Sequence, residues 1–173
     1  MVSKRCLIVD DEPVIRTMVS DCLDNRGYAC VIAKSAEIAL ELLAGSSFDI
    51  MITDIQMDGM TGIELTRMTR KLFPSMPVIV MTGFTDEYSY DEVVEAGAAD
   101  FLKKPFSIKE LDTRVARSIR DAQLISHVKK KGKDLEEVST LMIAGLQEEA
   151  LKKIATLEEE IRHLKEESYF KKP

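Results

Sequence analysis

The stretch LIVDDEP, residues 7–13, joins a short apolar run to three consecutive acids and a proline. An apolar run of this length is typical of a strand buried in a sheet, and Pro13 suits the first turn of a following helix. Asp10, Asp11 and Glu12 therefore lie at the carboxyl end of the predicted strand. Acids gathered at such a position need a physical explanation, because neighbouring carboxylates repel one another.

The same alternation of a short apolar run with a segment of helical period recurs along the first part of the chain. Strands that alternate with helices predict an α/β fold in which a parallel sheet is covered by helices on both faces. We expect a five-stranded, doubly wound, flavodoxin-like sheet with a C-terminal helical extension. The predicted strands are residues 6–9, 29–33, 50–53, 78–81 and 101–102.

Length and composition restrict the class of protein. A chain of 173 residues with 45% hydrophobic and 31% charged residues has the composition of a soluble globular domain with a short appendage. Its formal net charge of -6 argues against a main role in binding nucleic acid or an anionic membrane. Cys6, Cys22 and Cys30 show no metal-ligand spacing, so reduced core cysteines in a cytoplasmic protein are expected. No signal peptide and no membrane span is predicted.

Polar residues also follow the later predicted strands. Asp54 follows the third strand, Thr82 the fourth and Lys104 the fifth. Since the carboxyl ends of parallel strands open onto one crevice, these side chains should lie beside Asp10 and Asp11. Clustered carboxylates raise one another's pKa unless a cation joins them, and oxygen ligands suit Mg²⁺. The arrangement predicts a magnesium site in which Asp54 acts as a nucleophile towards a phosphoryl group.

Simpler roles exist for each residue taken alone. Asp10, Asp11 and Glu12 could be N-cap and first-turn acids that interact with the dipole of the following helix. That role fits Glu12, but it explains only one of the two aspartates. Thr82 alone is an ordinary strand-end residue, and Lys104 alone is an ordinary surface lysine. The prediction therefore depends on their occurrence together at the ends of consecutive strands.

With these residues in place, positions 4–123 closely resemble the receiver domain of two-component response regulators. The resemblance implies that Asp10, Asp11 and Asp54 bind Mg²⁺, with Asp11 in direct contact. The backbone carbonyl of Gln56 would complete the metal shell. The resemblance also implies that Asp54 accepts a phosphoryl group from the phosphohistidine of a sensor histidine kinase or a histidine phosphotransfer protein.

The resemblance assigns roles to the remaining site residues. Thr82 and Lys104 would bind the phosphoryl oxygens, and the Thr82 hydroxyl would be coupled to inward rotation of Phe101, where the family commonly has tyrosine. The Lys104–Pro105 peptide bond would be cis. Such a domain assists its own phosphorylation and dephosphorylation rather than turning over substrate like a conventional enzyme. Haloacid dehalogenase phosphatases also form an aspartyl phosphate, but they need a second aspartate at the position of Gln56.

The chain is expected to continue beyond a receiver at residues 1–127. A basic linker is predicted at 128–133, an amphipathic helix at 134–168 and a short tail at 169–173. Phosphorylation would bias the surface near the fourth helix and fifth strand, and the tail would relay the change. A constitutively dimeric scaffold, and the N-terminal part of a longer regulator with an output domain, are alternative interpretations.

The end of the predicted tail helix contains a short regular seam. Ile154 and Ile161 at a positions, with Leu157 and Leu164 at d positions, favour a parallel two-stranded coiled coil and hence a homodimer. In that register, complementary charges flank the seam at positions g and e: Lys153, Glu160, Glu158 and Lys165. A single amphipathic helix that packs on its own domain, or leads to a further element, is the alternative.

Overall fold

The structure is a computed structural model that describes residues 3–83 and 90–170, without the side chains of 164–170. It contains two compact units, residues 1–123 and 124–173. The strands are β1 (Arg5–Val9), β2 (Ala29–Ala33), β3 (Ile50–Asp54), β4 (Val78–Thr82) and β5 (Asp100–Lys103). The helices are α1 (Pro13–Asp24), α2 (Ala36–Gly45), α3 (Gly62–Leu72), α4 (Tyr90–Glu95), α5 (Ile108–Ile143) and α6 (Gln147–Phe170).

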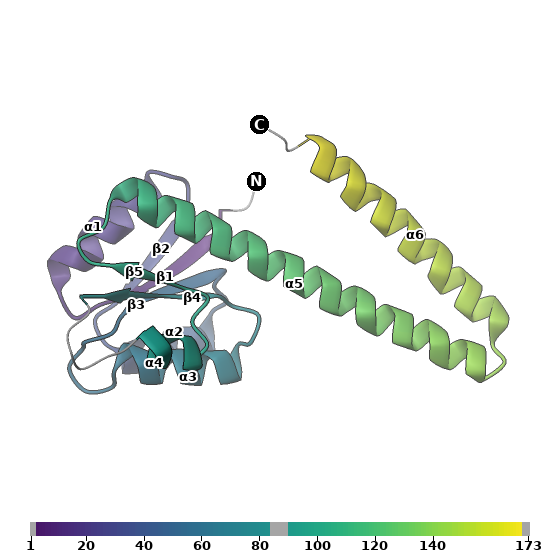
Figure 1. Ribbon diagram of the computed structural model, residues 1–173, viewed down its shortest axis with the longest axis horizontal. Helices are drawn as coiled ribbons and strands as arrows, with labels where there is room; N and C mark the ends of the chain where they lie inside the picture. Colours follow the sequence, from purple (N-terminus) through teal and green to yellow (C-terminus); the bar gives the residue numbers. More distant parts are fainter. Residues whose placement is uncertain (1–2, 84–89, 171–173) are drawn as a thin grey trace. The chain divides into compact units, whose positions relative to one another are not determined.

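The first unit is a parallel five-stranded sheet in the order β2-β1-β3-β4-β5. Each observed strand contains the predicted one, so the predicted α/β fold is confirmed (Figure 1). The order reverses at β1, because the chain adds β2 on one side and β3 to β5 on the other. The carboxyl ends of β1 and β3 are consequently neighbours, which is where this class of sheet forms its ligand crevice.

Helices cover both faces of the sheet. Alternate residues of each strand point to opposite sides, so each strand can contribute to both cores. On one face Leu7 and Val9 pack in a cluster with residues of α2, α3 and α4. On the other face Cys6 and Ile8 pack with residues of α1 and α5. The near-continuous apolar strands in the sequence are explained by this double coverage. Cys6, Cys22 and Cys30 carry free thiols, the first two buried and the third half-buried.

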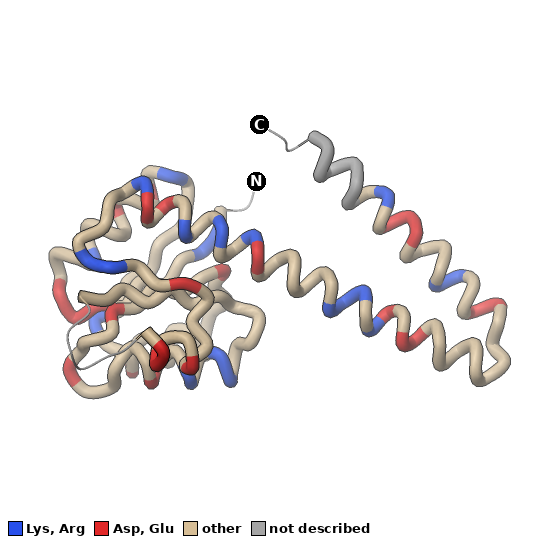
Figure 2. Tube along the Cα trace, viewed as in Figure 1, with Lys and Arg blue, Asp and Glu red and all other residues tan. Residues whose placement is uncertain are grey.

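The second unit is a helical hairpin made by the C-terminal part of α5 and by α6 (Figure 1). The linker predicted at residues 128–133 is wrong as a structural element, since these residues are helical and lie inside α5. Four of the six are lysines, which are good helix formers, and a single Gly132 costs too little to end the helix. Figure 2 shows this basic run followed by acidic residues farther along α5.

The single helix predicted at 134–168 is also wrong, because the chain turns at Gly145. This glycine has φ 78° and ends α5. Its N–H donates to the Met142 carbonyl (3.2 Å), and the Leu146 N–H donates to the Leu141 carbonyl (3.0 Å). These two bonds form the Schellman arrangement that terminates helices at a left-handed glycine.

The hairpin has a small core of its own. Val138 of α5 is buried with Ala150 and Leu157 of α6, and Leu141 and Ile154 pack against them. Part of the seam predicted for a parallel coiled coil is therefore used inside one chain. The side chains of Leu164 and Lys165 lie outside the described residues. Among the helices that the structure describes, none combines the length and apolarity needed to cross a membrane.

Candidate functional site

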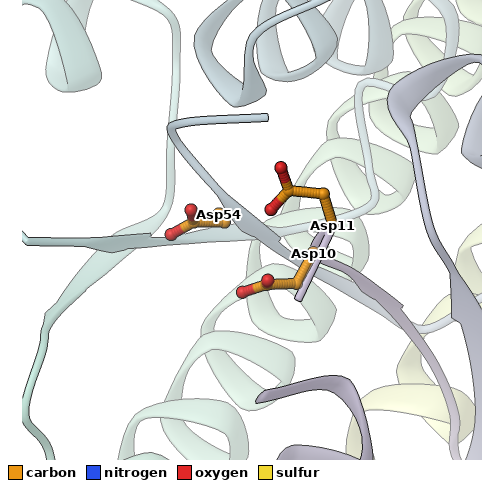
Figure 3. A group of neighbouring side chains, drawn as sticks. All are labelled: Asp10, Asp11 and Asp54. Atoms are coloured by element: carbon orange, nitrogen blue, oxygen red, sulfur yellow. The ribbon is translucent and has the colours of Figure 1, made fainter. Parts of the chain in front are cut away.

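Three carboxylates converge at the carboxyl ends of β1 and β3 (Figure 3). Asp10 directly follows β1 and is fully buried, whereas Asp11 is exposed. Asp54 is the last residue of β3 and is 7% exposed. One oxygen atom from each of the three carboxylates lies within 4.8 Å of the others. Three hard oxygen donors at this spacing fit a divalent cation such as Mg²⁺.

Lys104, the residue after β5, reaches two of the acids. Its Nζ lies 2.9 Å from Asp54 Oδ1 and 3.1 Å from Asp10 Oδ2. The Lys104–Pro105 peptide bond is cis, as expected, and the Lys104 N–H donates to the Thr82 carbonyl (2.8 Å). Lys104, which was predicted only from its place after the fifth strand, thus contacts the acids although β4 separates β5 from β3 in the sheet.

The pKa values at the site reflect burial of charge. Burial raises the pKa of Asp54, and the charge of Asp10 raises it further, although hydrogen bonding and attraction from Lys104 oppose both effects. Burial lowers the pKa of Lys104, but its hydrogen bonds and attraction to Asp54 and Asp10 outweigh this and leave the pKa raised. Both directions indicate excess negative charge in a partly desolvated space, which a bound cation would neutralise.

The alternative role of the acids as helix caps finds limited support. Glu12 is the N-cap residue of α1, but its side chain makes no capping hydrogen bond within the described part of the chain. Instead the Asp10 Oδ1 accepts from the Glu12 N–H (2.9 Å). Asp10 therefore fixes the turn into α1 with one oxygen while its other oxygen meets Lys104.

The corner between β3 and α3 positions Asp54, and sequence reasoning missed the residue on which it depends. A Cβ atom built on Gly62 would lie 1.8 Å from the Asp54 carbonyl oxygen, so only glycine fits. The Gly62 N–H donates to the Ile55 carbonyl (2.9 Å). A capping box between Thr61 and Glu64 fixes the start of α3 beside this contact. The capping pattern is readable in the sequence, but the close approach of two backbones is not.

The other predicted residues lie around this cluster. Thr82 ends β4 and is 2% exposed, and β4 is adjacent to β3 in the sheet. Gln56 is exposed two residues after Asp54. The contact of Thr82 with a phosphoryl group and the contact of the Gln56 carbonyl with a metal ion stay predictions.

Phe101 lies half-buried in β5 with two partners that the sequence did not indicate. Its ring packs edge-to-face on Tyr90 of α4, with centroids 5.1 Å apart. The Arg114 guanidinium of α5 lies 5.7 Å from the Phe101 centroid and pairs with Asp100 at 2.7 Å and Glu110 at 3.1 Å. No local motif connects these residues, since they come from three elements. An aromatic pair and an ionic network thus connect α4, β5 and α5.

A doubly wound sheet with paired acids, a third aspartate and a lysine at its strand ends defines the receiver fold. Residues 6–116 match the profile of the response regulator receiver domain. Response regulator protein FleR of Pseudomonas aeruginosa is 37% identical over 116 residues, which are 67% of this chain and 24% of FleR. The match to FixJ of Bradyrhizobium diazoefficiens covers 57% of that protein. The chain thus spans between about a quarter and somewhat over half of the length of these two relatives.

Solved structures agree with this assignment. A response regulator receiver domain protein from Clostridium thermocellum has a TM-score of 0.67 at 27% identity, covering 70% of this chain and 98% of that one. Response regulator TrrA of Thermotoga maritima, solved with Mg²⁺ and BeF, has a TM-score of 0.62 at 33% identity, covering 66% and 98%. The chain belongs to the family of response regulator receiver domains of two-component systems. The matched family is that of receiver domains, not that of haloacid dehalogenase phosphatases.

Proposed function

We propose that this chain is a phosphoryl-accepting response regulator in which Asp54 takes a phosphoryl group from a phosphohistidine of a sensor kinase or phosphotransfer protein. The observation that carries the proposal is the position of Asp54, whose Oδ1 lies 2.9 Å from the Lys104 ammonium while its carboxylate adjoins those of Asp10 and Asp11. Asp10 also contacts Lys104 (3.1 Å), but Asp10 is fully buried and its other oxygen accepts from the Glu12 N–H. Magnesium binding in receiver domains and the Mg²⁺-BeF complex of TrrA give further support.

The proposed reaction is a displacement at phosphorus. An Asp54 carboxylate oxygen attacks, a new P–O bond forms, and the P–N bond to the donor imidazole breaks with the electron pair returning to the ring. Lys104 stabilises the negative charge on the phosphoryl oxygens, and the Thr82 hydroxyl donates to one of them. Asp10, Asp11, Asp54 and the Gln56 carbonyl would hold Mg²⁺, which neutralises the charge that builds up when the anions meet.

In this proposal the signal leaves the site through the face made by α4, β5 and α5. Phe101 joins α4 to the ionic network around Arg114 through Tyr90. A shift of the Thr82 hydroxyl towards the phosphoryl group would leave space for Phe101 to move inward. Because α5 is one continuous helix from Ile108 to Ile143, it contributes residues to both units. A scaffold whose output ignores phosphorylation is the competing function.

The test of the acceptor compares two aspartates four residues apart. Wild type, Asp54→Asn and Asp58→Asn are incubated with Mg²⁺ and acetyl phosphate, and uptake is read by intact mass. Asp58 is an exposed acid on the loop after β3 and serves as a matched control. We expect a single phosphoryl adduct on wild type and Asp58→Asn, and none on Asp54→Asn. Equal uptake by Asp54→Asn would refute the assignment.

The metal site has its own matched pair. Asp11→Asn removes an exposed carboxylate of the cluster, whereas Glu12→Gln removes its exposed neighbour outside it. Losing one of three carboxylates should weaken Mg²⁺ binding roughly tenfold or more. The measurement is stabilisation against thermal unfolding as Mg²⁺ is added. Equal Mg²⁺ affinity in the two variants would show that Asp11 is not a ligand.

A further inference from the structure

Among residues 124–163, whose side chains the structure describes, the hairpin of the second unit has one apolar face that is left exposed. We define this apolar face as a set of exposed side chains from α5 and α6: Leu124, Val128, Leu135, Met142, Leu151 and Ile161. Their exposed fractions are large, for example 67% for Val128, 62% for Leu135 and 61% for Leu151. Exposed aliphatic side chains of this size in one patch mark an interaction surface rather than a solvated helix face.

Helical geometry shows that these side chains share one side of the hairpin. Each residue of an α-helix is rotated about 100° from the one before it. The four side chains of the apolar face on α5 therefore lie about 40° to 80° around the helix from buried Val138. Counting in the same way from buried Ala150, the two on α6 lie about 20° to 100° around it. The helices run antiparallel, so equal rotation from the shared core brings both groups to the same side of the plane that contains the two helices.

The opposite side of the hairpin is charged. Lys153 of α6 lies 3.1 Å from Glu137 and 3.7 Å from Asp134 of α5. By the same count these three residues lie about 40° to 100° in the other rotational direction. Lys131 and Glu160 form a further ion pair across the hairpin. The unit therefore has one face closed by ion pairs and one face that is aliphatic, which is the pattern of half a four-helix bundle.

The hairpin also buries too little to account for its length. Among the side chains described up to residue 163, three are buried between the two helices: Val138, Ala150 and Leu157. Ordering that much chain costs more free energy than so small a core returns. A further apolar partner on the exposed face would supply the missing burial.

We propose that the apolar face binds the same face of a second copy of this chain, which gives a two-fold symmetric four-helix bundle. The proposal goes beyond the phosphoacceptor function and does not depend on it. It also differs from a parallel coiled coil of two α6 helices, because each hairpin stays closed and α5 supplies most of the contact. Since α5 begins in the receiver unit, the bundle would join two receivers permanently.

Size and charge favour a second copy as the occupant. The paired part of the hairpin, about 30 Å long and about 20 Å wide, offers roughly 600 Å² per copy. Two copies would bury roughly 1,200 Å², the lower limit for a specific stable interface. Glu158 and Arg162 lie one turn apart at the rim of the face. A two-fold axis between antiparallel copies of α6 would place Glu158 of each copy against Arg162 of the other.

The test is sedimentation of the full chain over a range of concentrations. The double variant Leu135→Gln/Leu151→Gln replaces two exposed leucines of the apolar face. Glutamine is polar but keeps helix propensity. Thr140→Gln with Thr156→Gln is the matched control, because both threonines are exposed on the same two helices but face away from the patch. Circular dichroism confirms that each variant keeps its helix content. All measurements are repeated on Asp54→Asn and after incubation with acetyl phosphate.

We expect wild type, the control and Asp54→Asn to dimerise alike, and the double leucine variant to dimerise at least about 100-fold more weakly. Leu135→Gln alone distinguishes the bundle from an α6 coiled coil, since only the bundle places α5 in the interface. A monomeric wild type would overturn the proposal, as would a dimer that survives the double leucine substitution. Loss of phosphoryl uptake leaves these results unchanged, so failure of the two proposals can be told apart.

Discussion

The receiver unit and the hairpin are both built from amphipathic elements, but they differ in how completely each buries its own apolar surface. In the receiver two clusters fill both faces of the sheet, and every strand contributes to them. In the described part of the hairpin, a cluster of three buried side chains lies between two helices whose outer rows remain exposed. A sheet with helices on both faces closes on itself, whereas two helices leave a face that needs another partner. The following variants test this contrast, one unit at a time.

The largest effect is expected from Gly62→Ala in the receiver. Its Cβ would collide with the Asp54 carbonyl, so α3 must move away from β3. We expect a loss of about 3 kcal/mol or more in the free energy of unfolding, measured by denaturant titration of receiver tertiary signals. Gly45→Ala is the control, because a Cβ there meets nothing within 4 Å. If both substitutions are tolerated equally, the close approach at the Asp54 corner is wrong.

Lys104→Met should have the next largest effect. It leaves Asp10 and Asp54 as two buried carboxylates without their shared cation. Because Lys104 is itself 21% exposed, we expect a loss of about 2 kcal/mol rather than the larger cost of a fully buried pair. The measurement is unfolding in EDTA, with the exposed neighbour Lys103→Met as control. Mg²⁺ should recover part of the loss in Lys104→Met, since a cation again joins the acids.

The strands and the acidic cluster could be predicted because each has a local signal. Apolar runs such as residues 6–9 and 50–53 specify buried strands, and strand order then brings Asp10, Asp54 and Lys104 to one edge. Gly62 could not be predicted as critical, because its role depends on the distance between two backbones. The contacts of Phe101 were also hidden, since they join separate elements.

The hairpin was predicted less well for a physical reason. The composition of residues 134–168 indicates that helices form, but it does not indicate where they pack. The same row of apolar residues can pack against a helix of its own chain or against a helix of another copy. The basic run 129–133 suggested a linker, although lysine propagates a helix well. Gly145 lies inside this helix-forming stretch, and its left-handed conformation turns the chain. A single backbone angle thus decides whether Leu157 meets its own α5 or another copy.

Leu157→Ala tests the hairpin without altering the receiver. Leu157 is 7% exposed and packs against Val138 and Ala150, so truncation should destabilise the hairpin by about 2 kcal/mol. Hydrogen exchange of α6 amides should accelerate, whereas exchange in the strands should stay as in wild type. Glu159→Ala, at an exposed position two residues farther along the same helix, should leave α6 exchange almost unchanged. Faster hydrogen exchange in the strands of Leu157→Ala would show that the two units unfold together.

The smallest effect is expected from Lys153→Glu on the charged side of the hairpin. The ammonium faces Glu137 and Asp134, and its pKa is raised chiefly by the hydrogen bond to Glu137. Charge reversal replaces attraction by repulsion, but exposure and salt screen the change, so proteolysis within α6 should become roughly two- to fivefold faster at low salt. Lys152→Glu, whose partner Glu148 lies on the same helix, should not separate the helices. If high salt fails to reduce the difference between the two variants, the ion pairs do not hold the hairpin closed, and its closure depends on the apolar side alone.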